Sequence, residues 1–142
     1  MTIQKCKLDH LGGLGIFFSN HVVDSVIAGN ELLGIADTGI ALVGSTFYAD
    51  GTQPTHPERN LVTMNHIHEV GVVGKGQAAY FQALASHNTV SRNVMYNGPR
   101  TGIEWCVLKL LSKPQSFSLV DSRNQLQHVY TLAPLILTGF CL

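Results

Sequence analysis

The feature that most constrains this chain is an internal repeat built around asparagine. Four short segments share an apolar first residue, and the fourth residue of each is Cys6, Asn30, Asn65 or Asn93. Two residues later the copies carry Leu8, Leu32, Ile67 or Met95, and nine residues later they carry Gly15, Gly39, Gly74 or Gly102. The copies lie 24, 35 and 28 residues apart. This spacing indicates a unit of about two dozen residues with two insertions.

The length of the repeat separates the possible architectures. A repeat made of a helix pair needs about 33 residues or more, whereas a coil of a parallel β-helix or a leucine-rich repeat needs about 20 to 29. The copies hold Val, Ile, Thr, Gly and Asn in short alternating runs, without helical periodicity. We therefore predict an all-β fold, a right-handed parallel β-helix of about four coils over residues 1–103, with insertions near 47–59 and 75–79.

Strand alternation assigns two faces to each coil. Asn65 and Ile67 fall on one face and His66 and His68 on the other, and the apolar column at Ile67 makes the asparagine face the inward one. An amide both donates and accepts, so we expect a structural ladder of Asn30, Asn65 and Asn93 that ends at Cys6. We also expect these asparagines to adopt the left-handed conformation, and the recurring glycines to have positive φ.

Composition narrows the possible partners. Nine basic residues balance nine acidic residues, and only 13% of the chain is charged, so no basic patch for nucleic acid or for an anionic membrane surface is predicted. The first residues have no apolar region of the kind found in signal peptides, and no apolar run is long enough to span a bilayer. The sequence leaves the compartment and the oligomeric state open, and it requires no cofactor.

Several segments also carry a resemblance. DGTQP at 50–54, NHIHEVGVVGK at 65–75 and AAYFQALASHNTVSRNVMYNGPRTGI at 78–103 resemble right-handed parallel β-helix repeat proteins of the pectin-lyase superfamily. The similarity covers residues 8–103, and members of such families are usually much longer, so the resemblance implies a fragment of a larger protein. It also implies polysaccharide lyases, epimerases or glycoside hydrolases among the relatives, although this fold hosts more than one reaction.

The resemblance ends after Ile103. Residues 104–142 lack the next asparagine with its apolar partners and glycine, so we interpret them as a divergent tail. One hypothesis is a shifted reading frame, a retained intron or a truncated gene model. The alternative is a cap that covers the open end of the solenoid.

One group of outward residues has the chemistry of a metal site. His66 and His68 lie two apart on one strand, and the repeat places Glu31 beside His66 in the preceding coil. Two imidazoles and a carboxylate can bind Zn²⁺. The competing interpretation is that these are ordinary solvent-facing histidines.

A second group would suit polysaccharide cleavage, which needs a group that neutralises a uronate carboxylate, a base and an acid. Lys75 and Arg100 are the catalytic candidates, and Lys75 stands where the repeat predicts isoleucine. Arg59, His56 and Tyr48 are candidates for substrate binding. Tyr80 and Tyr96 could also stack on sugars, although Tyr80 equally suits strand packing.

Two classes of function remain open for the sequence. The first is a non-catalytic fragment, or a structural or carbohydrate-binding module, and this is the one that the sparse set of charged residues favours. The second is a lyase-like or other carbohydrate-active enzyme acting on uronate-containing polysaccharide. Polysaccharide is the candidate partner under the carbohydrate-binding and the enzymatic interpretations.

Overall fold

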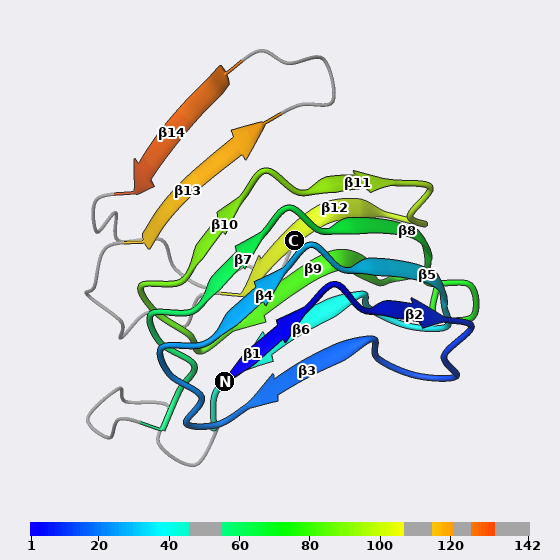
Figure 1. The fold of residues 1–142 in the computed structure, drawn as a ribbon, viewed down its shortest axis with the longest axis horizontal. Coiled ribbons are helices and arrows are strands. Elements are labelled where there is room, and N and C mark those ends of the chain that lie inside the picture. The colour runs from blue at the N-terminus through cyan, green and yellow to red at the C-terminus, as the bar shows by residue number, and fades with distance from the viewer. Residues whose placement is uncertain (46–54, 107–114, 121–125, 133–142) are drawn as a thin grey trace.

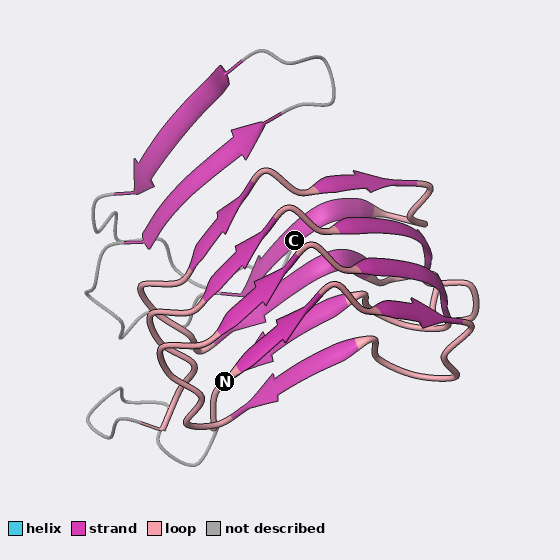
Figure 2. Ribbon diagram, in the orientation of Figure 1, coloured by secondary structure: helices cyan, strands magenta, loops and turns pink. Residues whose placement is uncertain are grey.

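The protein is described by a computed structural model that covers residues 1–45, 55–106, 115–120 and 126–132, with side chains in the first two ranges. The strands are β1 (Thr2–Gln4), β2 (Lys7–Asp9), β3 (Ile16–Ser19), β4 (Val26–Ala28), β5 (Glu31–Ile35), β6 (Ile40–Val43), β7 (Leu61–Thr63), β8 (His66–Val70), β9 (Ala78–Ala83), β10 (Thr89–Ser91), β11 (Val94–Tyr96), β12 (Thr101–Cys106), β13 (Gln115–Val120) and β14 (Leu126–Leu132). Strands and loops make up the described residues (Figure 2). No helix able to cross a membrane occurs in the part of the chain that the structure describes.

The strands form three sheets that stack every third strand. Sheet 1 has the order β1-β4-β7-β10-β13-β14, sheet 2 contains β2, β5, β8 and β11, and sheet 3 contains β3, β6, β9 and β12. Every pair within the first twelve strands is parallel. Each set of three consecutive strands therefore makes one coil, and Figure 1 shows the coils stacked along the solenoid. The predicted parallel β-helix of about four coils is confirmed.

The strands continue past residue 103. β12 pairs with β9 as far as Cys106 opposite Ala83. β13 adds a parallel strand beside β10, and β14 pairs with β13 in the antiparallel sense. The boundary between a repeat region at 1–103 and a tail at 104–142 stays a prediction.

The core lies between the three sheets and is built from the apolar columns of the repeat. In sheet 2 the column runs through Leu8, Leu32, Ile67 and Met95, which face one another in register. Leu32 and Ile67, in the two middle coils, are fully buried. Burial of each such side chain contributes roughly 1.5–3 kcal/mol, so the middle coils hold most of the hydrophobic stabilisation.

An asparagine ladder runs along the corner between sheets 1 and 2. The side-chain amide of Asn30 donates to Oδ1 of Asn65 at 2.9 Å, and that of Asn65 donates to Oδ1 of Asn93 at 2.9 Å. Each Oδ1 also accepts a hydrogen bond from the backbone N–H of the residue at the same ladder position in the preceding coil. At the start of the ladder this donor is Cys6 N, which lies 3.0 Å from Asn30 Oδ1. The ladder therefore satisfies side chains and turn backbone together.

The expected left-handed conformation of these asparagines was wrong. The residue before each ladder position has positive φ instead: Lys5 (53°), Gly29 (64°), Met64 (55°) and Arg92 (54°). The chain bends at that residue, so the asparagine is free to begin an extended segment with its amide turned inward. The bend costs roughly 1–2 kcal/mol where the residue is not glycine, and the ladder offsets that cost.

The predicted positive φ of the recurring glycines was also wrong. Gly15, Gly39, Gly74 and Gly102 all lie outside the left-handed region. For Gly15 and Gly39 the reason for glycine is close packing, because a Cβ would collide with the carbonyl oxygen of Gly39 or Ala79 in the next coil.

The structure corrects the sequence alignment of the third coil in the column that contains Ile40 and Ile103. Ile40 of β6 faces Tyr80 of β9, and Tyr80 in turn faces Ile103 of β12. Tyr80 is fully buried, and its burial raises the pKa of its phenol. Tyr80 thus holds the inward position that the sequence assigned to Lys75, while Gly74 and Lys75 belong to the turn that joins β8 to β9. A buried Tyr80 is also unable to stack on a sugar.

Candidate functional site

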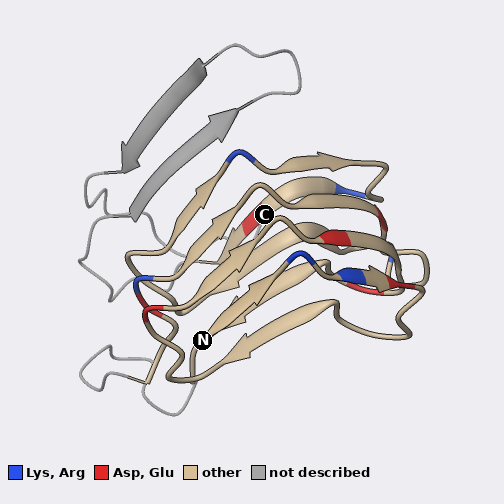
Figure 3. Ribbon diagram, viewed as in Figure 1, with Lys and Arg blue, Asp and Glu red and all other residues tan. Residues whose placement is uncertain are grey.

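The charged residues that lie on described strands are concentrated on one sheet. Lys7, Asp9, Glu31 and Glu69 lie on strands of sheet 2, whereas the described strands β1, β4, β7 and β10 of sheet 1 carry no Asp, Glu, Lys or Arg. Among the described strands of sheet 3, Glu104 is the one charged residue. Figure 3 shows this concentration along β2, β5 and β8 and at the turns. Among the three sheets, sheet 2 therefore carries the most charged side chains on its described strands.

The outward side chains of sheet 2 form two rows across the coils. One row runs through Lys7, Glu31, His66 and Val94. The second row runs through Asp9, Leu33, His68 and Tyr96. Parallel pairing in register places the members of each row about 4.8 Å apart, so neighbouring side chains are in reach of one another.

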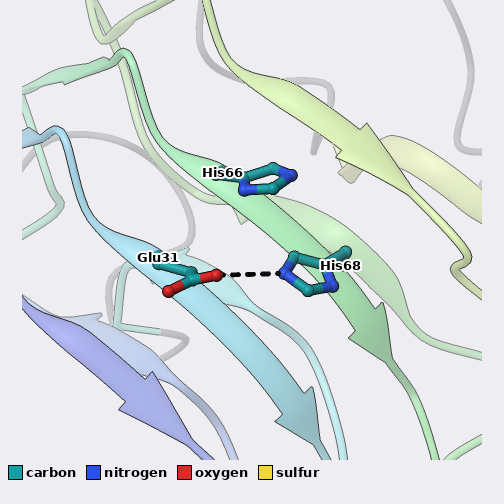
Figure 4. A group of neighbouring side chains, drawn as sticks. All are labelled: Glu31, His66 and His68. Carbon is teal, nitrogen blue, oxygen red and sulfur yellow. Dashed lines mark ion pairs between the residues drawn. The ribbon is translucent and has the colours of Figure 1, made fainter.

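Glu31, His66 and His68 converge on this face. One nitrogen of each ring and one carboxylate oxygen all lie within 4.8 Å of one another. Figure 4 shows both rings above β8, with the carboxylate reaching toward His68 from β5. His68 Nε2 lies 3.6 Å from Glu31 Oε1. Two imidazoles and one carboxylate are a donor set suited to a divalent transition metal.

Aromatic contacts hold His68 in place. The Tyr96 ring stacks on the His68 ring with centroids 5.0 Å apart and an angle of 7° between the planes. His66 makes tilted contacts with both rings, with its centroid 4.5 Å from that of His68 and 5.4 Å from that of Tyr96. The His68 side chain is only 13% exposed, whereas Tyr96, at the edge of the sheet, remains 44% exposed. The histidine is thus oriented by packing, and the tyrosine keeps a free surface.

Lys7 sets the electrostatics of Glu31. Its ammonium lies 3.3 Å from Glu31 Oε2 and hydrogen-bonds the carboxylate, which, together with a smaller effect of His68, lowers the pKa of Glu31. His68 Nε2 is buried and makes no hydrogen bond among the described residues, although it faces Glu31 Oε1. The carboxylate is therefore ionised, with one oxygen held by Lys7 and the other turned toward the ring.

The two catalytic candidates lie at the corner between sheets 2 and 3. Lys75 Nζ donates to the backbone carbonyl of Val72 at 2.7 Å. Arg100 Nη1 donates to Glu104 Oε1 at 3.1 Å and to the carbonyl of Gly76 at 3.4 Å. The second contact brings Arg100 to the turn that contains Lys75. Both cations thus already have partners near this corner: Lys75 bonds to its own turn, and Arg100 bonds to that same turn and to Glu104 of β12.

Two of the three substrate-binding candidates lie at a different corner, between sheets 3 and 1. Arg59 donates two hydrogen bonds to the carboxylate of Asp24, at 2.8 and 2.9 Å. His56 is buried, and its Nε2 lies 2.9 Å from Ser86 Oγ. Tyr48 lies outside the described residues. The described catalytic and substrate-binding candidates therefore lie at two different corners.

Sequence reasoning missed the role of Lys7 and a second asparagine ladder, in which the Asn60 amide donates to Asn88 Oδ1 and Ser25 N donates to Asn60 Oδ1. Ser25, Asn60 and Asn88 each stand five residues before a member of the first ladder, and that fixed offset was the available signal. Lys7 likewise shares its repeat position with Glu31 and His66. Tyr96 shares the position of His68, which explains why the two rings stack.

The chain matches no protein-family model, and comparisons with curated proteins and with solved structures also give no match. What the register of the strands establishes is a parallel β-solenoid.

Proposed function

We propose that this chain is a non-catalytic β-solenoid module that binds polysaccharide on the outward face of sheet 2. The observation that carries the proposal is the exposed ring of Tyr96 at the edge of the sheet whose described strands carry the most charged side chains. Sugars present apolar ring faces and hydroxyl groups, so an aromatic platform beside donors and acceptors complements them. The rows of sheet 2 run along the solenoid, which suits an extended chain of sugars.

The charges on this face favour a neutral polysaccharide. Three carboxylates, Asp9, Glu31 and Glu69, accompany a single ammonium from Lys7 on the strands of this sheet. A polymer of uronates would bring further negative charge beside these carboxylates, and like charges repel. We therefore expect neutral polysaccharides to bind better than uronate polymers.

The experiment is affinity electrophoresis of the purified chain through gels that contain single polysaccharides, with EDTA present throughout. Wild type is expected to be retarded by at least one neutral polysaccharide, and Tyr96→Ala to migrate as it does in an empty gel. Phe17→Ala is the matched control, because Phe17 is an aromatic residue of similar exposure on sheet 3 (49%). Equal losses in both variants, or no retardation of wild type by any polysaccharide, would refute the proposal.

The enzymatic alternative is a lyase that cleaves uronate polysaccharide at the corner of Lys75 and Arg100. Its support is the contact of Arg100 with the carbonyl of Gly76, which brings two cations to one turn. The non-catalytic proposal is favoured because Lys75 donates to backbone and Arg100 pairs with Glu104. Unsaturated products released from a uronate polymer, and lost in Lys75→Met, would reverse that preference.

A further inference from the structure

We propose that Glu31, His66 and His68 bind one divalent transition-metal ion of the Zn²⁺ class on the outward face of sheet 2. The proposal goes beyond polysaccharide binding and does not depend on it. Imidazole nitrogens with a single carboxylate select Zn²⁺ and its transition-metal neighbours, whereas Mg²⁺ and Ca²⁺ prefer sites made of oxygen ligands.

The distances suit one shared ion. Ligand atoms about 2.0–2.2 Å from a tetrahedral Zn²⁺ are about 3.4 Å from each other. His68 Nε2 and Glu31 Oε1 are already 3.6 Å apart, and the three ligand atoms together lie within 4.8 Å. Closing the set requires a rotation of the His66 ring, which stands on the same side of β8 as His68 (Figure 4).

His68 is prepared for this role by its surroundings. Its Nε2 is buried and has no hydrogen-bond partner among the described residues, which is costly for a polar atom. The stack with Tyr96 fixes the plane of the ring, so the nitrogen is held toward Glu31. A metal would satisfy the nitrogen without further rearrangement of the buried ring.

Lys7 acts as a positioning residue. It holds Glu31 through Oε2, which leaves Oε1 turned toward His68. Groups that hold the second atom of a ligand fix its orientation and commonly change metal affinity about 10- to 100-fold. Because Glu31 and His66 are partly exposed, a water molecule or another ligand could take the fourth position of the ion.

The test is titration of the full chain with Co²⁺, followed by visible absorption, and with Zn²⁺, followed by calorimetry. Wild type is expected to bind one equivalent and to give the intense absorption of tetrahedral Co²⁺. His66→Gln, His68→Gln and Glu31→Gln are each expected to lose at least about tenfold in affinity. His87→Gln is the matched control, because His87 also pairs with a carboxylate, Glu58, at 3.3 Å, and should bind like wild type.

Two outcomes would overturn the proposal. The first is no binding by wild type up to millimolar metal. The second is equal binding by wild type and by a variant that combines Glu31→Gln, His66→Gln and His68→Gln. Circular dichroism checks that each variant folds, and Glu31→Gln, which alters a partly exposed side chain, keeps the test decisive if His68→Gln does not fold. Since the electrophoresis is run in EDTA, loss of the metal site and loss of polysaccharide binding are separately visible.

Discussion

Within the part of the chain that the structure describes, the solenoid has two asparagine ladders at two corners, and they differ in length. The first ladder, between sheets 1 and 2, joins Asn30, Asn65 and Asn93. The second ladder, between sheets 3 and 1, joins Asn60 to Asn88, and at Ser25 it reaches only a backbone N–H. The same kinds of hydrogen bond occur at both corners, so the pattern follows from the geometry of the coil. A ladder includes each coil whose sequence has an asparagine at that position.

The difference predicts unequal contributions to stability. Asn65 Oδ1 accepts both the backbone N–H and the side-chain amide of Asn30. Asn60 Oδ1 accepts the backbone N–H of Ser25, and Ser25 has no amide to add. Buried polar groups that lose their partners cost about 1–3 kcal/mol each, so the middle of the first ladder should be the more sensitive position.

The largest effect is expected from Asn65→Ala. The change removes the acceptor for two donors of Asn30 and the donor to Asn93 and to the carbonyl of Ile27. We expect a loss of roughly 3–5 kcal/mol in the free energy of unfolding, measured by urea denaturation. The control is Gln4→Ala, which removes an exposed side-chain amide from β1 at a residue without positive φ and should cost little.

A smaller loss is expected from Asn60→Ala. The change leaves Ser25 N without its acceptor and removes the donor to Asn88 and to the carbonyl of Val22. We expect about 2 kcal/mol in the same assay. If Asn60→Ala were as destabilising as Asn65→Ala, ladder length would not explain the difference between the corners.

A gain is expected from Cys6→Asn, which would lengthen the first ladder by one member. Cys6 N already donates to Asn30 Oδ1, so an amide at position 6 would stand beside the same acceptor. Because Cys6 is exposed, the gain should be small, about 0.5 kcal/mol. Cys6→Ser, which lacks the amide, should give no such gain, and a shared gain would mean that removal of the thiol is responsible.

The smallest expected effect is on the pH dependence of stability, and it arises from one ion pair at the corner between sheets 3 and 1. Arg59, by hydrogen bond and by charge, lowers the pKa of Asp24 from its ordinary value of 3.8. The folded state then binds fewer protons than the unfolded state, so the stabilisation is present above that value and is lost as pH falls through the lower folded-state pKa. Urea midpoints at about pH 7 and about pH 3 should therefore differ slightly less in Arg59→Met than in wild type. Both residues are exposed, so an identical pH dependence would show that the pair contributes nothing measurable.

Much of the fold could be predicted from the sequence, because a repeat imposes one geometry on every copy. The spacing of Asn30, Asn65 and Asn93 predicted the length of each coil. Strand alternation correctly predicted that Ile67 points inward and His66 outward. The assignment failed at Lys75, where an insertion breaks the fixed offsets. The structure resolves this break by hydrogen-bond register, which places Tyr80 beside Ile40.

The candidate site could be predicted only in part. The repeat placed Glu31 beside His66, since residues at one repeat position become neighbours in parallel register. The buried state of His68 Nε2, its stack with Tyr96 and the division of the Glu31 carboxylate between Lys7 and His68 depend on side-chain orientation, about which spacing carries no information.

By itself, then, the sequence determined that this chain coils, how many residues each coil takes and which side chains of sheet 2 point outward, because period and alternation are local properties of the backbone. Only the tertiary structure decided which groups Lys75 and Arg100 contact, and that the bends fall one residue before each asparagine. It also decided that the charged residues on strands lie mainly on sheet 2. Those properties arise where separate coils meet, and contacts between coils are set by packing and hydrogen bonding across the stack.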